Sequence, residues 1–117
     1  MTSSFLIVDE DRNFREALAI ALRLDGHDAT VAATSEEART HLASRPFACC
    51  VVDVRLAGAD TVLEAAAATG ARAVVTGPYA ELLEAARARH PRAAALAKPF
   101  HAFDLLRLLG SAARAAG

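Results

Sequence analysis

Short apolar runs alternate with amphipathic segments along the whole chain. FLIV at 5–8 and ACCVV at 48–52 are continuous apolar runs, which are typical of strands buried on both faces of a sheet. RAVVT, DATVAA and AAALA are shorter runs in equivalent places, each between two helical patterns. Strands are therefore predicted at 5–8, 28–33, 48–54, 72–76 and 93–97.

The segments between these runs have helical periodicity and helix-ending signals. From residue 12 to 24 the apolar positions recur on one helical face, and Gly26 follows. Thr34 and Glu37 match a capping box that opens a second helix, which Arg45 and Pro46 end. Further helices are predicted at 61–68, 80–89 and 102–115. Five strands alternating with five helices predict right-handed crossovers and a doubly wound α/β sandwich with a parallel sheet.

Composition narrows the class of protein. A length of 117 residues suits one domain. Its net charge of −1 offers no basic field for nucleic acid. No segment approaches the length of a membrane span, and the first residues lack a targeting pattern. Cys49 and Cys50 are adjacent in an apolar run, where they resemble small buried hydrophobes. We therefore expect a soluble, cytoplasmic protein without a membrane or a nucleic acid as direct partner.

Polar side chains follow four of the predicted strands. Residues 9–11 read Asp-Glu-Asp after the first strand, Asp53 closes the third, Thr76 the fourth, and Lys98 follows the fifth. Because parallel strands end at one edge of a sheet, these groups should meet there. Carboxylates bind Mg²⁺, a hydroxyl donates a hydrogen bond, and an ammonium group neutralises an anion. The set predicts a site for phosphoryl transfer to a carboxylate.

In these motifs the chain resembles the receiver domains of bacterial two-component response regulators, of the chemotaxis-regulator type. The resemblance covers essentially all 117 residues and is carried in order by LIVDED, VVDVRL, VVTG and AKPF. The spacings agree with it, since Asp53 lies 44 residues after Asp9 and Lys98 lies 22 residues after Thr76. It implies a flavodoxin-like strand order, 2-1-3-4-5, and a single receiver domain over 1–117 without an output domain.

The resemblance also implies roles for individual residues. Asp53 would accept a phosphoryl group from a histidine kinase or a phosphotransfer protein, with Thr76 as switch hydroxyl and Lys98 as charge partner. Asp9, Glu10, Asp53 and the backbone carbonyl of Arg55 would hold Mg²⁺, and Asp11 is predicted to cap the next helix. The Lys98–Pro99 peptide bond is expected to be cis.

Such a protein is a phospho-acceptor switch, with at most autodephosphorylation activity, and not an ordinary enzyme. A downstream protein target is expected on the face formed by 80–89, 93–97 and 102–115.

Three features depart from the family pattern. Ala57 replaces the usual proline after the acceptor, and only 23 residues separate Asp53 from Thr76, so the intervening helix must be short. Ala95 stands where most family members carry an aromatic residue. These changes affect the relay to a partner surface more than the phosphoryl chemistry.

Two other functions fit parts of the sequence. A receiver-like protein-interaction module with degenerate switching is compatible with the short helix and Ala95. The Asp-Glu-Asp string also fits a haloacid-dehalogenase-type phosphohydrolase, with Asp9 as nucleophile and Asp11 as acid and base. That enzyme needs a later acidic pair, and after Lys98 the chain has only Asp104.

Overall fold

The computed structural model describes residues 3–116, with side chains as far as residue 110. Five strands alternate with five helices, and every predicted element is present within two residues of its expected bounds. The elements are β1 (Ser4–Val8), α1 (Arg12–Leu24), β2 (Asp28–Ala32), α2 (Ser35–Ser44), β3 (Cys49–Asp53), α3 (Ala59–Thr69), β4 (Arg72–Gly77), α4 (Ala80–Arg89), β5 (Ala94–Ala97) and α5 (Ala102–Ala116).

The five strands form one parallel sheet in the order β2-β1-β3-β4-β5. This confirms the predicted doubly wound, flavodoxin-like architecture. Val8 pairs with Val52 and Asp53 pairs with Thr76, so the strands end nearly level. The polar residues that close them therefore share one edge of the sheet.

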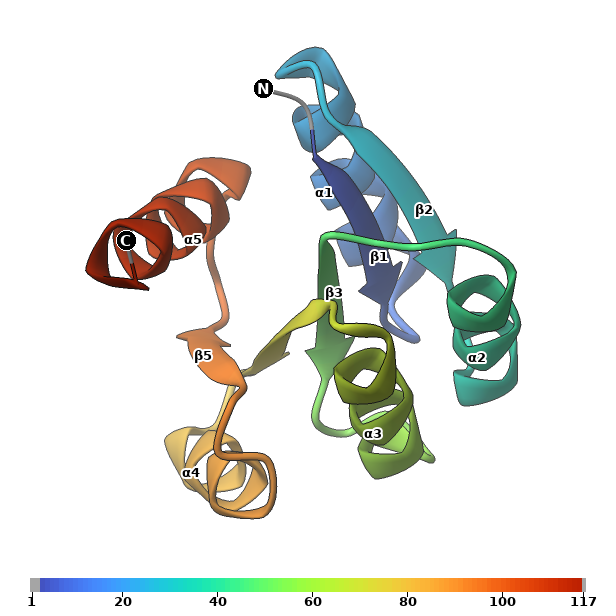
Figure 1. Ribbon diagram of the computed structural model, residues 1–117, viewed down its shortest axis with the longest axis vertical. Coiled ribbons are helices and arrows are strands. Elements are labelled where there is room, and N and C mark those ends of the chain that lie inside the picture. The colour runs from blue at the N-terminus through green and yellow to red at the C-terminus, as the bar shows by residue number, and fades with distance from the viewer. Residues whose placement is uncertain (1–2, 117) are drawn as a thin grey trace.

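Helices cover both faces of the sheet (Figure 1). Alternate residues of β1 point to opposite sides: Leu6 and Val8 belong to the apolar layer under α2, α3 and α4, while Phe5 and Ile7 belong to the layer under α1 and α5. All four are at most 1 % exposed. Burial on both faces explains why this strand is a continuous apolar run.

The helix starts follow the predicted capping signals in two cases. Asp11 Oδ1 accepts a hydrogen bond from the backbone N–H of Phe14 at 3.2 Å and caps α1. Thr34 Oγ1 accepts one from the backbone N–H of Glu37 at 3.1 Å, and the Glu37 carboxylate reaches back to the backbone N–H of Ala33 at 3.3 Å.

Helix α3 begins two residues earlier than predicted because its cap is a backbone turn. Gly58 precedes it with φ of 83°, in the left-handed region, and no side chain caps the helix. A Cβ at Gly58 would lie 2.6 Å from Ser35 Oγ, so a side chain there would collide with α2. A helix start of this kind is not detected by a search of the sequence for a Ser, Thr or Asp cap.

None of the helices in the described part of the chain is long and apolar enough to span a membrane. Cys49 and Cys50 are buried free thiols, and burial raises the pKa of each to about 12. Both therefore behave as packing residues, as the sequence indicated.

Candidate functional site

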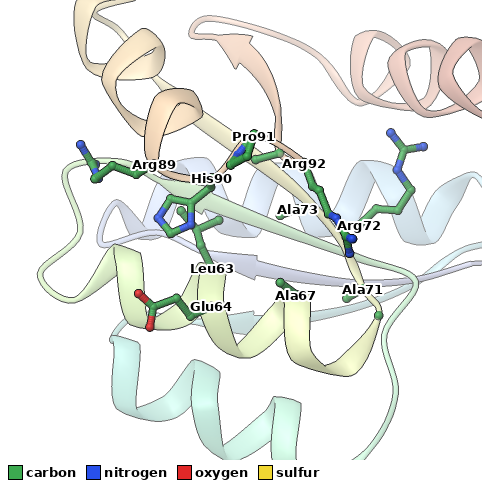
Figure 2. Close-up of a pocket in the computed structure, with 12 residues that line it drawn as sticks. Leu63, Glu64, Ala67, Ala71, Arg72, Ala73, Arg89, His90, Pro91 and Arg92 are labelled. Atoms are coloured by element: carbon green, nitrogen blue, oxygen red, sulfur yellow. The ribbon is translucent and has the colours of Figure 1, made fainter.

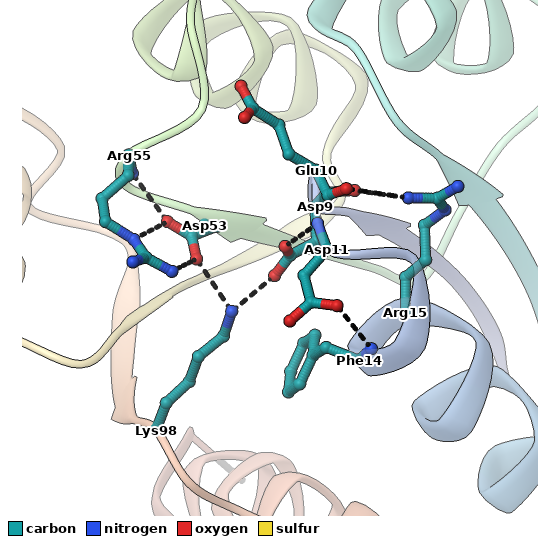
Figure 3. A network of polar contacts seen from close by, with 8 residues as sticks. All are labelled: Asp9, Glu10, Asp11, Phe14, Arg15, Asp53, Arg55 and Lys98. Carbon is teal, nitrogen blue, oxygen red and sulfur yellow. Dashed lines mark hydrogen bonds and ion pairs between the residues drawn. The ribbon is translucent and has the colours of Figure 1, made fainter.

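A largely buried lysine side chain bridges two buried aspartates at the carboxyl edge of the sheet (Figure 3). Lys98 Nζ lies 2.7 Å from Asp9 Oδ2 and 2.8 Å from Asp53 Oδ2. Both aspartates are only 3 % exposed. Three strands that are far apart in sequence thus place one positive and two negative charges in direct contact, as their positions at strand ends predicted.

Backbone and ring contacts fix the position of Lys98. Its backbone N–H donates to the carbonyl of Gly77 at 2.8 Å, which extends the pairing of β5 with β4. The Lys98–Pro99 bond is cis, as expected. The ammonium nitrogen also lies 4.0 Å from the centroid of the Phe14 ring, which packs edge-on against Phe100. The sequence did not indicate that Phe14 contacts Lys98, because its place on the inner face of α1 identifies it only as a core residue.

Asp53 is held by Arg55 as well as by Lys98. Asp53 Oδ1 accepts from the backbone N–H of Arg55 at 2.7 Å and from its Nε at 3.2 Å, while Oδ2 accepts from its Nη2 at 3.0 Å. Burial would raise the pKa of Asp53, but the hydrogen bonds from Arg55 and Lys98 outweigh it and hold that pKa below its ordinary value. Asp53 is therefore an ionised carboxylate at neutral pH. The sequence predicted a role only for the Arg55 carbonyl, and the return of its side chain to Asp53 was not anticipated.

Thr76 lies beside Asp53 with an unused hydroxyl. The two residues are direct partners across β3 and β4, and Thr76 is fully buried. Its Oγ1 is the one buried side-chain polar atom in the described part of the chain without a hydrogen-bond partner. A buried hydroxyl without a partner costs free energy, so Thr76 Oγ1 keeps an unused hydrogen bond next to Asp53.

The other two acidic residues of the opening motif do not join the bridge. Glu10 is exposed, and its carboxylate points away from Lys98 (Figure 3). Asp11 caps α1, as predicted. Asp9 uses both oxygens, since Oδ1 accepts the backbone N–H of Asp11 at 2.8 Å. Among the side chains that the structure describes, no three His, Cys, Asp or Glu residues gather closely enough to form a metal cage.

The acidic edge nevertheless has the donor chemistry for Mg²⁺. A cavity of about 410 Å³ is lined by Asp9, Glu10, Asp11, Asp53, Arg55 and Leu56. Mg²⁺ prefers oxygen ligands and is commonly held by one or two carboxylates with several waters retained. Asp9 and Asp53 supply such a pair, and the exposed Glu10 lines the same cavity. The residues therefore fit a hydrated Mg²⁺ and not a closed site of the zinc type.

A larger hollow of about 600 Å³ lies at the opposite edge of the sheet, between α3 and the end of α4 (Figure 2). Leu63, Ala67 and Ala71 contribute to its apolar lining. His90 at its rim is already engaged, with Nε2 at 2.7 Å from the Asp60 carboxylate. Arg89 and His90 at this hollow are thus paired with Asp60, whereas the two buried aspartates, Asp9 and Asp53, line the smaller cavity.

Solved structures identify the class of fold to which this arrangement belongs. A CheY-like response regulator receiver domain protein from Methanospirillum hungatei JF-1 has a TM-score of 0.82 at 23 % identity, covering 95 % of this chain and 93 % of its own. A two-component response regulator from Clostridium difficile gives 0.82 at 21 % identity, covering 96 % of both chains.

A third solved structure extends the comparison. A response regulator from Burkholderia pseudomallei, described with a phosphorylated aspartic acid, a calcium ion and citrate, gives a TM-score of 0.79 at 27 % identity over 89 % of this chain and 64 % of its own. No protein-family profile and no curated protein matches the sequence. The chain has the α/β fold of the flavodoxin type. More particularly, its fold is that of CheY-like response regulator receiver domains along nearly its whole length.

Proposed function

We propose that this protein is a phospho-acceptor switch of two-component signalling that receives a phosphoryl group on Asp53. The observation that carries the proposal is the Lys98 ammonium held between Asp9 and Asp53, at 2.7 and 2.8 Å. An ionised, buried carboxylate beside a fixed positive charge is a suitable nucleophile for phosphoryl transfer. A similar fold in the Burkholderia protein holds a phosphorylated aspartic acid, which supports the assignment.

The donor would be a phosphohistidine of a histidine kinase or a phosphotransfer protein. An Asp53 oxygen forms the new O–P bond while the N–P bond of the donor breaks, and that electron pair returns to the imidazole ring. Lys98 neutralises one transferred oxygen, and Thr76 Oγ1 donates its unused hydrogen bond to another. A divalent cation, when bound by Asp9 and Asp53 with Glu10 and the Arg55 carbonyl nearby, would neutralise the remaining negative charge.

The partner that reads the phosphorylated form is proposed to bind the face of α4, β5 and α5. Leu82 on α4 is 42 % exposed and Phe103 on α5 is 67 % exposed. Tyr79, just before α4, is 56 % exposed. Large apolar side chains on neighbouring elements are typical of a surface that binds another protein.

The test is intact-protein mass spectrometry after incubation with acetyl phosphate and Mg²⁺. The wild type should gain the mass of one phosphoryl group, and chelation of Mg²⁺ should prevent it. Asp53→Asn should remove the gain, while Asp104→Asn should not, because the Asp104 carboxylate accepts from the backbone N–H of His101 at 2.9 Å and takes no part in the site.

Two results would favour the other functions. Labelling that persists in Asp53→Asn but disappears in Asp9→Asn would support a phosphohydrolase with Asp9 as nucleophile. A wild type that is never labelled, by acetyl phosphate or by a phosphorylated donor protein, would support an interaction module whose site is not used.

A further inference from the structure

The Arg55 side chain covers the oxygens through which Asp53 would react. Its Nε and Nη2 each bind a different oxygen of Asp53, at 3.2 and 3.0 Å, in a two-point ion pair. The Arg55 backbone N–H and Lys98 Nζ take one further position on each oxygen. A carboxylate has about four acceptor positions in all, so Asp53 has none left for a metal ion.

The two cations on Asp53 differ in how firmly they are held. The Lys98 side chain is 13 % exposed and is fixed by Asp9 and the Phe14 ring as well as by Asp53. The Arg55 side chain is 48 % exposed, and Asp53 is the one residue to which it is hydrogen-bonded in the described part of the chain. Arg55 is therefore the cation that can leave without breaking other contacts.

Departure of the Arg55 side chain from Asp53 would cost little free energy and would open the acidic cavity. Arg55 lines this cavity beside Asp9 and Glu10, so a guanidinium group and a divalent cation would compete for the same carboxylate. The backbone N–H of Arg55 binds Asp53 Oδ1 at 2.7 Å independently of the side chain. Departure of the side chain would therefore leave the Asp53 carboxylate oriented.

We propose that the Arg55 side chain is a removable guard on Asp53, which must be displaced before a divalent cation binds the carboxylate. The proposal rests on the proposed function, because it concerns how that site is opened. In the metal-free protein the guard keeps Asp53 neutralised and its oxygens occupied. One part of the divalent cation's role in phosphorylation is then to displace the Arg55 side chain from Asp53.

The proposal predicts tighter metal binding when the guanidinium is removed. Arg55→Met keeps the length of the side chain and the backbone N–H but removes the competing charge. The Kd for the metal ion should fall about fivefold, which is the factor equivalent to a partly exposed ion pair of about 1 kcal/mol. Mn²⁺ serves as the probe, since the electron paramagnetic resonance signal of the free ion reports binding without any phosphoryl chemistry.

Arg15→Met is the matched control. The Arg15 guanidinium donates to the backbone carbonyls of Asp9 and Glu10, at 3.1 and 3.3 Å. Its removal takes one positive charge from the same acidic loop without uncovering Asp53. Arg55→Met should therefore tighten Mn²⁺ binding well beyond any change in Arg15→Met. An equal change in both variants would indicate general electrostatic repulsion, and an unchanged or weaker Kd in Arg55→Met would also overturn the guard.

Labelling of the same proteins separates this proposal from the proposed function. A wild type that is labelled on Asp53 at saturating Mg²⁺, together with no tighter binding in Arg55→Met, refutes the guard and leaves the acceptor role intact. Absence of Mn²⁺ binding and of labelling in every variant refutes both. The guard also predicts that Arg55→Met reaches half-maximal labelling at about fivefold lower Mg²⁺, and an unshifted Mg²⁺ requirement contradicts it.

Discussion

Replacing Lys98 with methionine should destabilise the protein through repulsion between Asp9 and Asp53. Both carboxylates are buried and both contact the same nitrogen, at 2.7 and 2.8 Å, so the two contacting oxygens lie no more than about 5.5 Å apart. Two unit charges at that distance repel by about 3 kcal/mol at an effective dielectric constant of about 20. Arg55 remains on Asp53 and offsets part of this. We therefore expect a loss of about 2 kcal/mol at neutral pH, somewhat below the roughly 3–5 kcal/mol typical of breaking a fully buried ion pair.

The assay is urea unfolding followed by far-ultraviolet circular dichroism, because the chain has no tryptophan and one tyrosine. The loss in Lys98→Met should shrink as the pH falls toward 4, since protonation of one carboxylate removes the repulsion. Arg107→Met is the control: it breaks an exposed ion pair of 3.7 Å with Asp104 and should cost well under 1 kcal/mol. A Lys98→Met protein within about 0.5 kcal/mol of the wild type at pH 7, or a loss that does not depend on pH, would refute the reasoning.

Two further predictions concern Thr76 and Asp60. In urea unfolding, the Thr76→Val protein should be as stable as the wild type or more stable by about 1 kcal/mol. The reason is that a buried hydroxyl without a partner is replaced by a methyl group of similar size. A loss above about 1 kcal/mol would mean that Oγ1 is hydrogen-bonded in solution. His90 and Arg89 lower the pKa of Asp60. A folded-state pKa below the unfolded value of about 3.9 stabilises the protein at pH values above about 3.9. This contribution is lost as the pH falls through the folded-state pKa. Asp60→Asn should therefore lower the free energy of unfolding by up to about 1 kcal/mol at pH 6, because the contact is half-exposed. Below the folded-state pKa of Asp60 the substitution should cost almost nothing. A stability difference that stays constant from pH 6 to pH 3 in parallel unfolding curves would exclude this linkage.

The residues that sequence analysis brought together correctly are those whose position follows from strand ends. Asp9, Asp53 and Lys98 each follow or close a buried strand, and the level register of a parallel sheet places them at one edge. Neither the length of a turn nor the direction of a long side chain enters that argument. It depends only on where apolar runs stop, which the sequence shows directly.

The residues that could not be placed are those whose direction depends on the turn after the strand. Glu10 is adjacent to Asp9, yet its carboxylate turns to solvent because the chain enters α1 through the Asp11 cap. Arg55 was assigned by its carbonyl alone, but a side chain two residues after Asp53 is long enough to return to it. Strand periodicity does not extend into a turn, so neither direction follows from the pattern.

On the proposed function, the two cations of the site would serve different needs, which fits their unequal burial. A site with Lys98 alone would leave Asp53 partly uncompensated in the resting protein and would favour entry of a metal at all times. A site with two buried cations would be stable but closed to metal and phosphoryl donor alike. On the proposed function, a phosphoryl group on Asp53 would add about one negative charge beyond that of the carboxylate it modifies, which calls for positive charge that is permanent at Lys98 and exchangeable at Arg55. The half-exposed Arg55 side chain beside the largely buried Lys98 side chain would provide that combination.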